Sequence, residues 1–273
     1  MSTSTFSGLR RVALAAAVSG FMAAAPAAYG VSLDVPYVPT PDDVVNRMLE
    51  VAQVGPEDFV IDLGSGDGRI AIAAVKDHNA KGALGVDLNP ERIAEARANV
   101  QEAGVSDKVE FREQNLFETD FSAATVLTMY LLPDVNVSLR PKVLELKPGT
   151  RVVSHAFDMA EWESDHYERV DGRSVYLWIV PAPVEGRWKL EGPQGALELD
   201  LAQRFQHVTG TAHASDGQTQ PVTGTLKGAS IELMVGEGEA ARSYTGNVQG
   251  SSMLLSGAAG PDGATHDWKG ERL

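Results

Sequence analysis

Apolar and polar residues follow two different patterns along this chain. Between residues 37 and 180, short apolar runs alternate with longer stretches whose apolar residues recur every three to four positions. The short runs predict buried strands, and the longer stretches predict amphipathic helices. Strands that alternate with helices predict an α/β fold, with a doubly wound, mostly parallel sheet joined by right-handed crossovers.

This first pattern predicts the positions of the helices and strands between residues 37 and 180. The first helix begins at Thr40-Pro41-Asp42-Asp43, where a capping residue and acids precede an apolar stripe. We expect strands at residues 59–62, 83–87, 109–112, 125–130 and 151–155, and a final antiparallel pair at 167–170 and 175–180. We expect further helices at residues 68–77, 90–103 and 133–146, the last interrupted near Pro141.

The second pattern begins after Pro181-Ala182-Pro183. From residue 185 to 273, short segments with alternating polarity are separated by glycine-rich turns. This pattern predicts a small antiparallel all-β domain, a sandwich or a barrel, of about seven or eight strands. Trp188 and Trp268 are expected to pack inside it. The predicted organisation is therefore a targeting segment at 1–30, an α/β domain at 31–181 and a β-rich domain at 185–273.

A glycine-rich turn follows the first predicted strand. Residues 60–69 read Val-Ile-Asp-Leu-Gly-Ser-Gly-Asp-Gly-Arg. Glycines at alternate positions let the backbone turn tightly and approach a ligand, because no Cβ is in the way. The spacing departs from the Gly-x-Gly-x-x-Gly with which dinucleotide folds bind a pyrophosphate. Asp67 lies where a phosphate would sit, and like charges repel, so a cationic ligand without phosphates, such as S-adenosylmethionine, is expected.

An acidic residue follows at the spacing that a nucleoside site requires. Asp87 ends the second predicted strand, 19 positions after Gly68. In doubly wound sheets an acid at this position accepts hydrogen bonds from ribose hydroxyls. A helix is then expected to begin at Asn89-Pro90-Glu91. Asn89 caps it, Pro90 suits its first turn, and the carboxylate of Glu91 complements the positive end of the helix dipole. The glycine turn and the spaced acid together predict a nucleoside-binding fold.

With these motifs the chain resembles the class I S-adenosylmethionine-dependent methyltransferases over roughly residues 37–180, about half of its length. The more specific resemblance is to the lysine methyltransferase family that includes the mitochondrial enzyme acting on the ATP synthase c-subunit. The segments that carry it are Tyr37-Val38-Pro39-Thr40-Pro41, Asp62–Arg69, Tyr130-Leu131-Leu132-Pro133 and Gly149–Ser154. The resemblance implies a Rossmann-like domain that transfers a methyl group from S-adenosylmethionine to a protein lysine. The motifs specify the cofactor and leave the substrate open.

The resemblance also implies roles for individual residues in cofactor binding. Asp62 would position the glycine loop and the amino group of the cofactor, and Gly64, Gly66 and Asp67 would form the loop itself. Asp87 would hold the ribose. Asn115 and Leu116, after the third strand, would contact the adenine, although family members often have Asp where this chain has Asn115. Tyr37 would close over the cofactor or staple the chain onto the first helix.

Methyl transfer from a sulfonium is an in-line displacement, so the enzyme mainly aligns the reacting atoms and excludes water. The expected catalytic residue is Tyr130, which follows the fourth strand, where N-methyltransferases receive the target amine. Its ring could bind a methyl-sulfonium or an ammonium by cation–π contact. The alternative is a core tyrosine. His155 ends the fifth strand and could accept a proton, or it could serve structure alone.

Composition limits the classes of partner. The net charge of −14 argues against nucleic acid and against anionic lipid headgroups, both of which need clustered Lys and Arg. The chain has no cysteine, which excludes disulfides, a thiolate nucleophile and cysteine-based zinc sites. The expected partner is a protein lysine or a small-molecule amine. We expect no metal, and we expect a monomer.

The first 30 residues have the pattern of a secretory signal peptide. Arg10 and Arg11 precede an alanine-rich apolar run, and small residues around Ala27 offer a cleavage site. This predicts export to the periplasm or cell envelope, or membrane anchoring if the segment is retained. Export conflicts with the cytoplasmic supply of S-adenosylmethionine. A non-catalytic envelope protein that binds nucleosides therefore stays as an alternative to a methyltransferase, and a nicotinamide oxidoreductase is disfavoured by the glycine spacing.

Overall fold

The computed structural model describes Met1 and residues 37–193, 195–257 and 265–273. Apart from Met1, the expected signal peptide at residues 1–30 lies outside the described residues. Within the described ranges, no helix has both the length and the apolar character that crossing a membrane requires.

The first domain is built on a seven-stranded sheet in the order β3-β2-β1-β4-β5-β7-β6. Its strands are β1 (Phe59–Leu63), β2 (Gly82–Asp87), β3 (Val109–Glu113), β4 (Val126–Met129), β5 (Arg151–His155), β6 (His166–Val170) and β7 (Arg173–Ile179). β1 to β5 pair in parallel, whereas β7 runs antiparallel to both β5 and β6. The predicted Rossmann-like fold is confirmed, and so is the antiparallel pair at its end.

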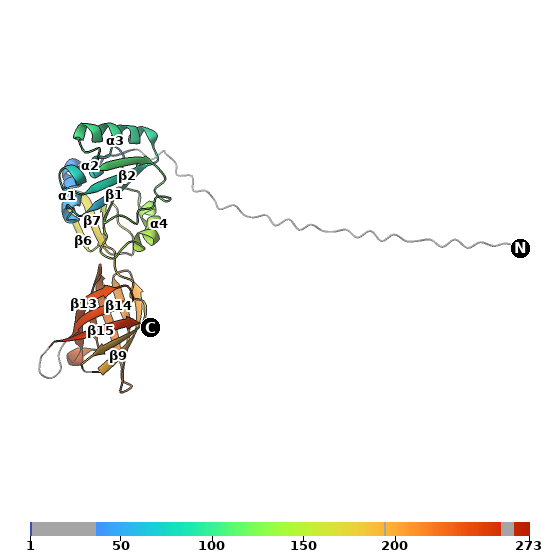
Figure 1. Ribbon diagram of the computed structural model, residues 1–273, viewed down its shortest axis with the longest axis vertical. Helices are drawn as coiled ribbons and strands as arrows, with labels where there is room; N and C mark the ends of the chain where they lie inside the picture. The colour runs from blue at the N-terminus through green and yellow to red at the C-terminus, as the bar shows by residue number, and fades with distance from the viewer. Residues whose placement is uncertain (2–36, 194, 258–264) are drawn as a thin grey trace. The chain divides into compact units, whose positions relative to one another are not determined.

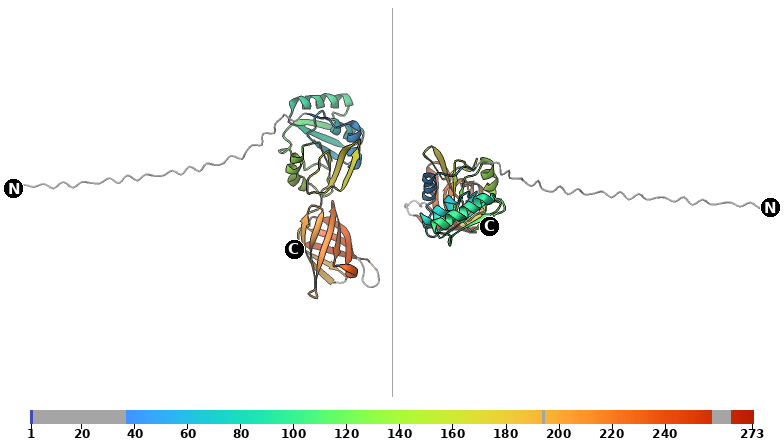
Figure 2. Two further views of the ribbon diagram at one scale, coloured as in Figure 1. Left: turned by 180° about the vertical axis from the view of Figure 1, so that it is seen from behind. Right: turned by 90° about the horizontal axis from the view of Figure 1, so that it is seen from above.

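Helices cover both faces of this sheet. α1 (Asp42–Val51), α2 (Arg69–Lys76) and α3 (Pro90–Ala103) share one buried cluster, to which Val60 of β1 contributes. α4 (Pro133–Leu144) packs in a second cluster with Ile61. Successive side chains of a strand point to opposite faces, so each parallel strand supplies both clusters. Figures 1 and 2 show the helices around the sheet, with α1 and α4 on opposite sides.

The expected interruption of α4 at Pro141 is wrong. The helix continues through Pro141 to Leu144. A proline inside a helix removes one hydrogen bond and crowds the preceding turn, but Leu139 and Val143 on either side of it are buried in the core. Packing of this apolar face outweighs the local backbone cost, which a reading of proline alone does not capture.

The second domain is a closed antiparallel barrel in the order β10-β11-β12-β13-β14-β15-β8-β9, coloured orange to red in Figure 1. Its strands are β8 (Gly186–Gly192), β9 (Gly195–Arg204), β10 (His207–Ala214), β11 (Thr219–Lys227), β12 (Ser230–Val235), β13 (Arg242–Gln249), β14 (Ser252–Gly257) and β15 (His266–Arg272). The sequence predicted either a sandwich or a barrel, and because the sheet closes on itself the domain is a barrel. Trp188 and Trp268 are 0% and 4% exposed within the barrel core, as expected.

Candidate functional site

The glycine turn lies directly after β1, at the carboxyl edge of the parallel strands. Gly64 and Gly66 adopt φ angles of 75° and 54°, a left-handed conformation that side chains rarely tolerate. A Cβ on Gly64 would lie 2.7 Å from Leu131 Cδ2, and one on Gly66 would lie 2.4 Å from the Tyr37 ring. Three of the four segments that carry the family resemblance, 37–41, 62–69 and 130–133, therefore meet around this turn.

Asp87 braces the turn from the end of β2. Its Oδ2 accepts a hydrogen bond from Gly66 N at 3.0 Å, and its Oδ1 accepts one from Asn89 N at 2.8 Å. A carboxylate has about four lone-pair positions, so these two bonds leave capacity for a ligand hydroxyl. The structure places Asp87 beside the glycine loop, as a ribose-binding acid requires, and its contact with ribose stays a prediction.

Asp62 is buried beneath the turn, with 1% of its surface exposed. Its Oδ1 accepts a hydrogen bond from Thr128 Oγ1 at 2.7 Å, while its Oδ2 is buried without a partner among the described residues. Burial raises the pKa of Asp62 to about 7; the bond from Thr128 opposes this rise, and the charges of Asp87 and Asp67 add to it. Ser65 Oγ is likewise buried without a partner among the described residues. Two polar atoms that lack partners at one edge favour a polar, cationic ligand there.

Asp67 is held by a neighbour that the sequence analysis did not single out. Arg69 donates to both of its carboxylate oxygens, with Nε at 3.0 Å from Oδ1 and Nη2 at 2.6 Å from Oδ2. Burial raises the pKa of Asp67, but the bonds and charge of Arg69 outweigh burial and lower it. Arg69 therefore compensates the charge of Asp67, and that charge by itself does not exclude a phosphate from the turn. A direct role of Asp67 in cofactor binding stays a prediction.

The lead-in segment 37–41 lies against the same turn. The Tyr37 hydroxyl accepts a hydrogen bond from Asp67 N at 3.4 Å, and the Arg92 guanidinium lies 4.9 Å from the centroid of its ring. Farther along the segment, Thr40 O accepts a hydrogen bond from Arg69 Nη1 at 2.9 Å. The Tyr37 side chain is 43% exposed, so its ring covers the turn from the solvent side. This position suits the expected closing role.

Tyr130 begins the segment after β4 and is half-buried. Its ring centroid lies 4.0 Å from that of His155 and 6.4 Å from that of Phe157. His155 is only 2% exposed, and its Nδ1 lies 3.0 Å from Thr40 Oγ1 in a hydrogen bond. Burial lowers the pKa of His155 to about 4, and the nearby charge of Arg173 lowers it further. A neutral imidazole therefore backs the Tyr130 ring.

Asn115 and Leu116 follow β3 at the same edge of the sheet. Asn115 Oδ1 accepts a hydrogen bond from Phe117 N at 3.0 Å, which closes a local turn. Leu116 is partly buried against the core cluster of α4. Contact with adenine stays a prediction for both residues. Among the described residues, no three His, Asp or Glu side chains converge to hold a metal ion.

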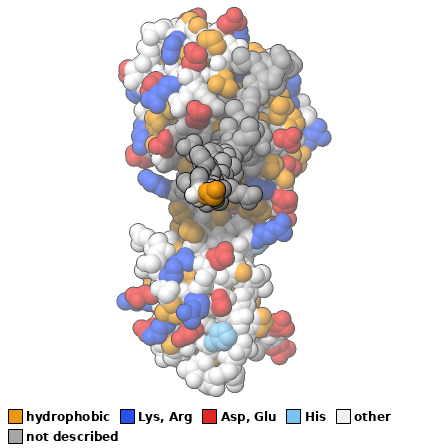
Figure 3. All heavy atoms as spheres, turned by 90° about the vertical axis from the view of Figure 1, so that its right-hand side faces the viewer, with side chains coloured by type: hydrophobic (Ala, Val, Ile, Leu, Met, Phe, Trp, Pro, Cys, Tyr) orange, Lys and Arg blue, Asp and Glu red, His pale blue; other side chains and the backbone are white. Residues whose placement is uncertain are grey.

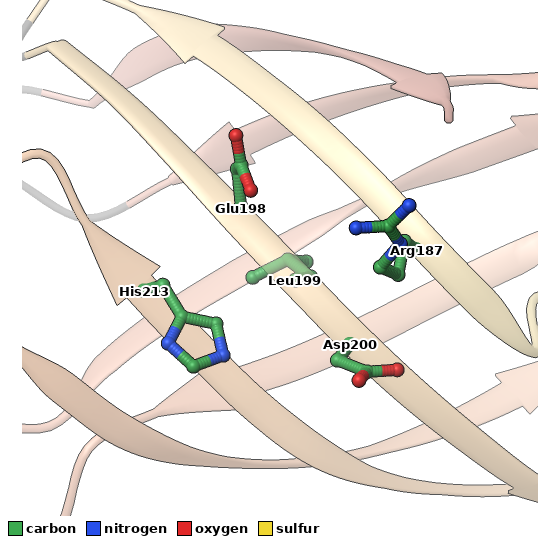
Figure 4. Close-up of a pocket in the computed structure, with 5 residues that line it drawn as sticks. All are labelled: Arg187, Glu198, Leu199, Asp200 and His213. Atoms are coloured by element: carbon green, nitrogen blue, oxygen red, sulfur yellow. The ribbon is translucent and has the colours of Figure 1, made fainter.

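A hollow of about 330 Å³ lies elsewhere, on the outside of the barrel (Figure 4). It is lined by Leu199 and four charged or titratable side chains, which form the cross-strand pairs Arg187–Asp200 and Glu198–His213. All four side chains are exposed. Charge pairs across neighbouring strands are an ordinary way to stabilise a solvated sheet face, so we assign the chemistry to the edge of the first sheet.

The side chains at that edge fit S-adenosylmethionine. Left-handed glycines allow close approach of the backbone, Asp87 retains acceptor capacity, and Asp62 and Ser65 present buried polar atoms that lack partners. The glycine turn and the acid lie at the carboxyl ends of adjacent strands, where ligands bind in open α/β sheets. Fold and site together define a class I S-adenosylmethionine-dependent methyltransferase.

Comparison with known proteins narrows this class. Residues 62–166 match the ANTKMT methyltransferase domain. A protein-lysine N-methyltransferase of Saccharolobus islandicus is 52% identical over 151 residues, covering 54% of this chain and 94% of that protein. The adenine nucleotide translocase lysine N-methyltransferase of Mus musculus is 35% identical over 132 residues, covering 48% of this chain and 57% of that protein. The chain belongs to the ANTKMT methyltransferase family.

A solved structure supports the cofactor. The crystal structure of an RNA methyltransferase from Salinibacter ruber contains S-adenosyl-L-homocysteine, and that protein is 52% identical to this chain, with a TM-score of 0.53. The match covers 54% of this chain and 96% of that one. S-adenosylmethionine is accordingly the cofactor of this protein, as predicted. The non-catalytic alternative finds no support.

Proposed function

We propose that the protein is a protein-lysine N-methyltransferase. The observation that carries this proposal is the Saccharolobus islandicus relative named for that activity. It is 52% identical to this chain, and the match covers 94% of the relative and 54% of this chain. The family match over residues 62–166 agrees with it. In this proposal the β1–β2 edge holds the cofactor, and the region after β4 receives the amine.

When bound, S-adenosylmethionine supplies an electrophilic methyl group on a sulfonium cation. Asp62, Asp87 and the glycine loop would fix its position, while Tyr37 would cover it. The chain then has to hold the target nitrogen in line and exclude water, because alignment provides most of the acceleration in such a displacement.

A target lysine must enter as a neutral amine, because an ammonium has no lone pair for the methyl group. Removal from water lowers the pKa of an amine. The Tyr130 ring, backed by the buried His155, offers an apolar wall for this step, and the same ring can attract a cationic centre through its face. Tyr130 is therefore our proposed catalytic contact.

RNA is the second candidate acceptor, because the Salinibacter protein of equal identity is named an RNA methyltransferase. The net charge of −14 disfavours it, since most binding energy for nucleic acid comes from Lys and Arg that neutralise phosphates. Figure 3 shows Lys and Arg interspersed with Asp and Glu over the visible face. A protein acceptor agrees better with this surface.

The test uses the whole protein, tritium-labelled S-adenosylmethionine and a bacterial lysate that contains both protein and RNA. We expect label in protease-sensitive material, and acid hydrolysis should recover it as methyl-lysine. Label that ribonuclease releases, label in small amines, or no enzyme-dependent label in protein would each overturn the proposal. Asp87→Ala is the matched negative control.

A further inference from the structure

A buried histidine lies at the proposed acceptor side without an assigned role. His155 ends β5, 2% exposed, and its ring is 4.0 Å from the Tyr130 ring, tilted by 38°. At this separation the two rings are in direct contact. Because His155 is held inside the core while Tyr130 is half-buried, His155 supplies the fixed surface against which the Tyr130 ring rests.

A hydrogen bond fixes His155 in turn. Its Nδ1 lies 3.0 Å from Oγ1 of Thr40, which is 3% exposed and 115 positions away in sequence. This bond sets which ring nitrogen points toward the threonine and thereby the rotation of the imidazole. Since both partners are buried, loss of either would leave a polar atom without a partner in the core.

The same threonine connects the acceptor side with the cofactor turn. Its carbonyl accepts a hydrogen bond from Arg69, and Arg69 holds Asp67 at the turn. Tyr37, three residues before Thr40, covers the turn itself. The lead-in segment thus contacts the cofactor side through one end and the acceptor side through the other.

We propose that Thr40 and His155 form a positioning pair that fixes the Tyr130 ring at the methyl-acceptor side. This inference rests on the proposed function, in which the amine is received beside Tyr130. A positioning role suits His155 better than proton transfer. A proton acceptor works best with a pKa near the working pH, whereas burial and the positive charge of Arg173 lower the pKa of this imidazole to about 4 and keep it neutral.

The first test is kinetic. Thr40→Val preserves shape and removes the hydroxyl, and His155→Phe preserves the ring and removes the hydrogen bond. With lysate protein as acceptor and varied S-adenosylmethionine, each variant should lower the maximal rate about tenfold through misplacement of the ring, with unchanged KM and calorimetric affinity for the cofactor. Thr150→Val is the matched control: Thr150 is 4% exposed, donates to Ala124 O and lies near the opposite end of β5. It should keep the wild-type rate.

Coupling distinguishes positioning from general damage to the fold. In a Tyr130→Leu background the Thr40→Val change should cost no further rate, because contacting residues that act through one another are not additive. Equal losses in both backgrounds, or a Thr40→Val rate equal to the wild-type rate, would overturn the inference.

A second measurement does not depend on activity. The ring signals of Tyr130 in nuclear magnetic resonance should carry a ring-current shift from His155 that His155→Leu removes, and Thr40→Val should speed the flipping of the Tyr130 ring. Wild-type ring behaviour in both variants would overturn the inference. If wild-type enzyme labels no lysate protein, the proposed function fails, and the ring measurement then decides whether the positioning pair exists.

Discussion

The edge of the methyltransferase sheet and the strands of the barrel differ in how many buried polar atoms lack a hydrogen-bond partner. Among the described residues, five side chains bury a polar atom without a partner: Asp62, Ser65, Asn136, Trp162 and Gln206. Two of them belong to the cofactor turn, and none lies on a barrel strand, since Gln206 lies in the turn between β9 and β10. Buried polar atoms are normally paired. The contrast indicates that the sheet edge is prepared for a ligand, whereas the barrel core is complete by itself.

The largest expected effect is on the stability of the barrel, and it should leave cofactor binding at the sheet edge unchanged. Trp188 is fully buried in the barrel cluster, which shares no residue with the two clusters of the sheet. Trp188→Ala should lower the free energy of unfolding of the barrel by about 3–5 kcal/mol, measured by denaturant titration. Calorimetric affinity for S-adenosylmethionine should stay at the wild-type value under native conditions. A parallel loss of affinity would break the contrast between the two regions.

Asp87→Ala should abolish most cofactor binding. It removes the acceptor of Gly66 N and Asn89 N together with the expected ribose contact. Hydrogen bonds to charged groups contribute about 1.5–3 kcal/mol each, so the dissociation constant should rise at least about a hundredfold. Titration calorimetry measures this, and circular dichroism should show a retained fold. Asp200→Ala, on the exposed wall of the barrel, serves as the control with no change.

Asp62 should make the stability of the free protein depend on pH. Its folded pKa, about 7, exceeds the ordinary value of 3.8, so the folded state binds more protons than the unfolded state between these values. Stability contributed by Asp62 is therefore full below about pH 4 and is lost as pH rises through 7. Relative to Asp62→Asn, the wild-type protein should lose about 4 kcal/mol across this window. The difference between the two proteins removes the contribution of His155, whose lowered pKa acts in the opposite direction between about pH 4 and 6.5. A flat difference curve would contradict the prediction.

The smallest effect concerns the Tyr37 hydroxyl. Its bond to Asp67 N is long, at 3.4 Å, whereas the ring itself covers Gly66. Tyr37→Phe should therefore weaken cofactor binding by less than about fivefold, since a neutral hydrogen bond contributes about 0.5–1.5 kcal/mol even when its geometry is good. Tyr37→Ala, which removes the cover, should weaken binding more. Equal effects of the two changes would assign the role to the hydroxyl.

Local patterns predicted most of the elements and the cofactor edge. The helix at 90–103 and the strand at 151–155 were predicted with the bounds that the structure has, because caps and apolar runs mark their ends. The barrel could not be told from a sandwich, because closure depends on pairing between its first and last strands, β8 and β15, which alternation does not encode. The bond between Thr40 and His155 joins residues 115 positions apart and was likewise beyond local patterns. The basic residue next to the glycine turn, Arg69, was the one signal in the sequence that could have revealed the pairing of Asp67.

The barrel begins and ends at neighbouring strands. β15 pairs antiparallel with β8, and Arg272 lies opposite Trp188. A segment whose first and last strands are partners closes every hydrogen-bonded ladder within itself and leaves no sheet edge that another strand must complete. Such a unit can be gained or lost in evolution as a cassette, without cutting a ladder in the domain before it. The protein-lysine N-methyltransferase of Saccharolobus islandicus is matched over 94% of its own length by 54% of this chain, which leaves no room in that relative for a second domain of the size of this barrel.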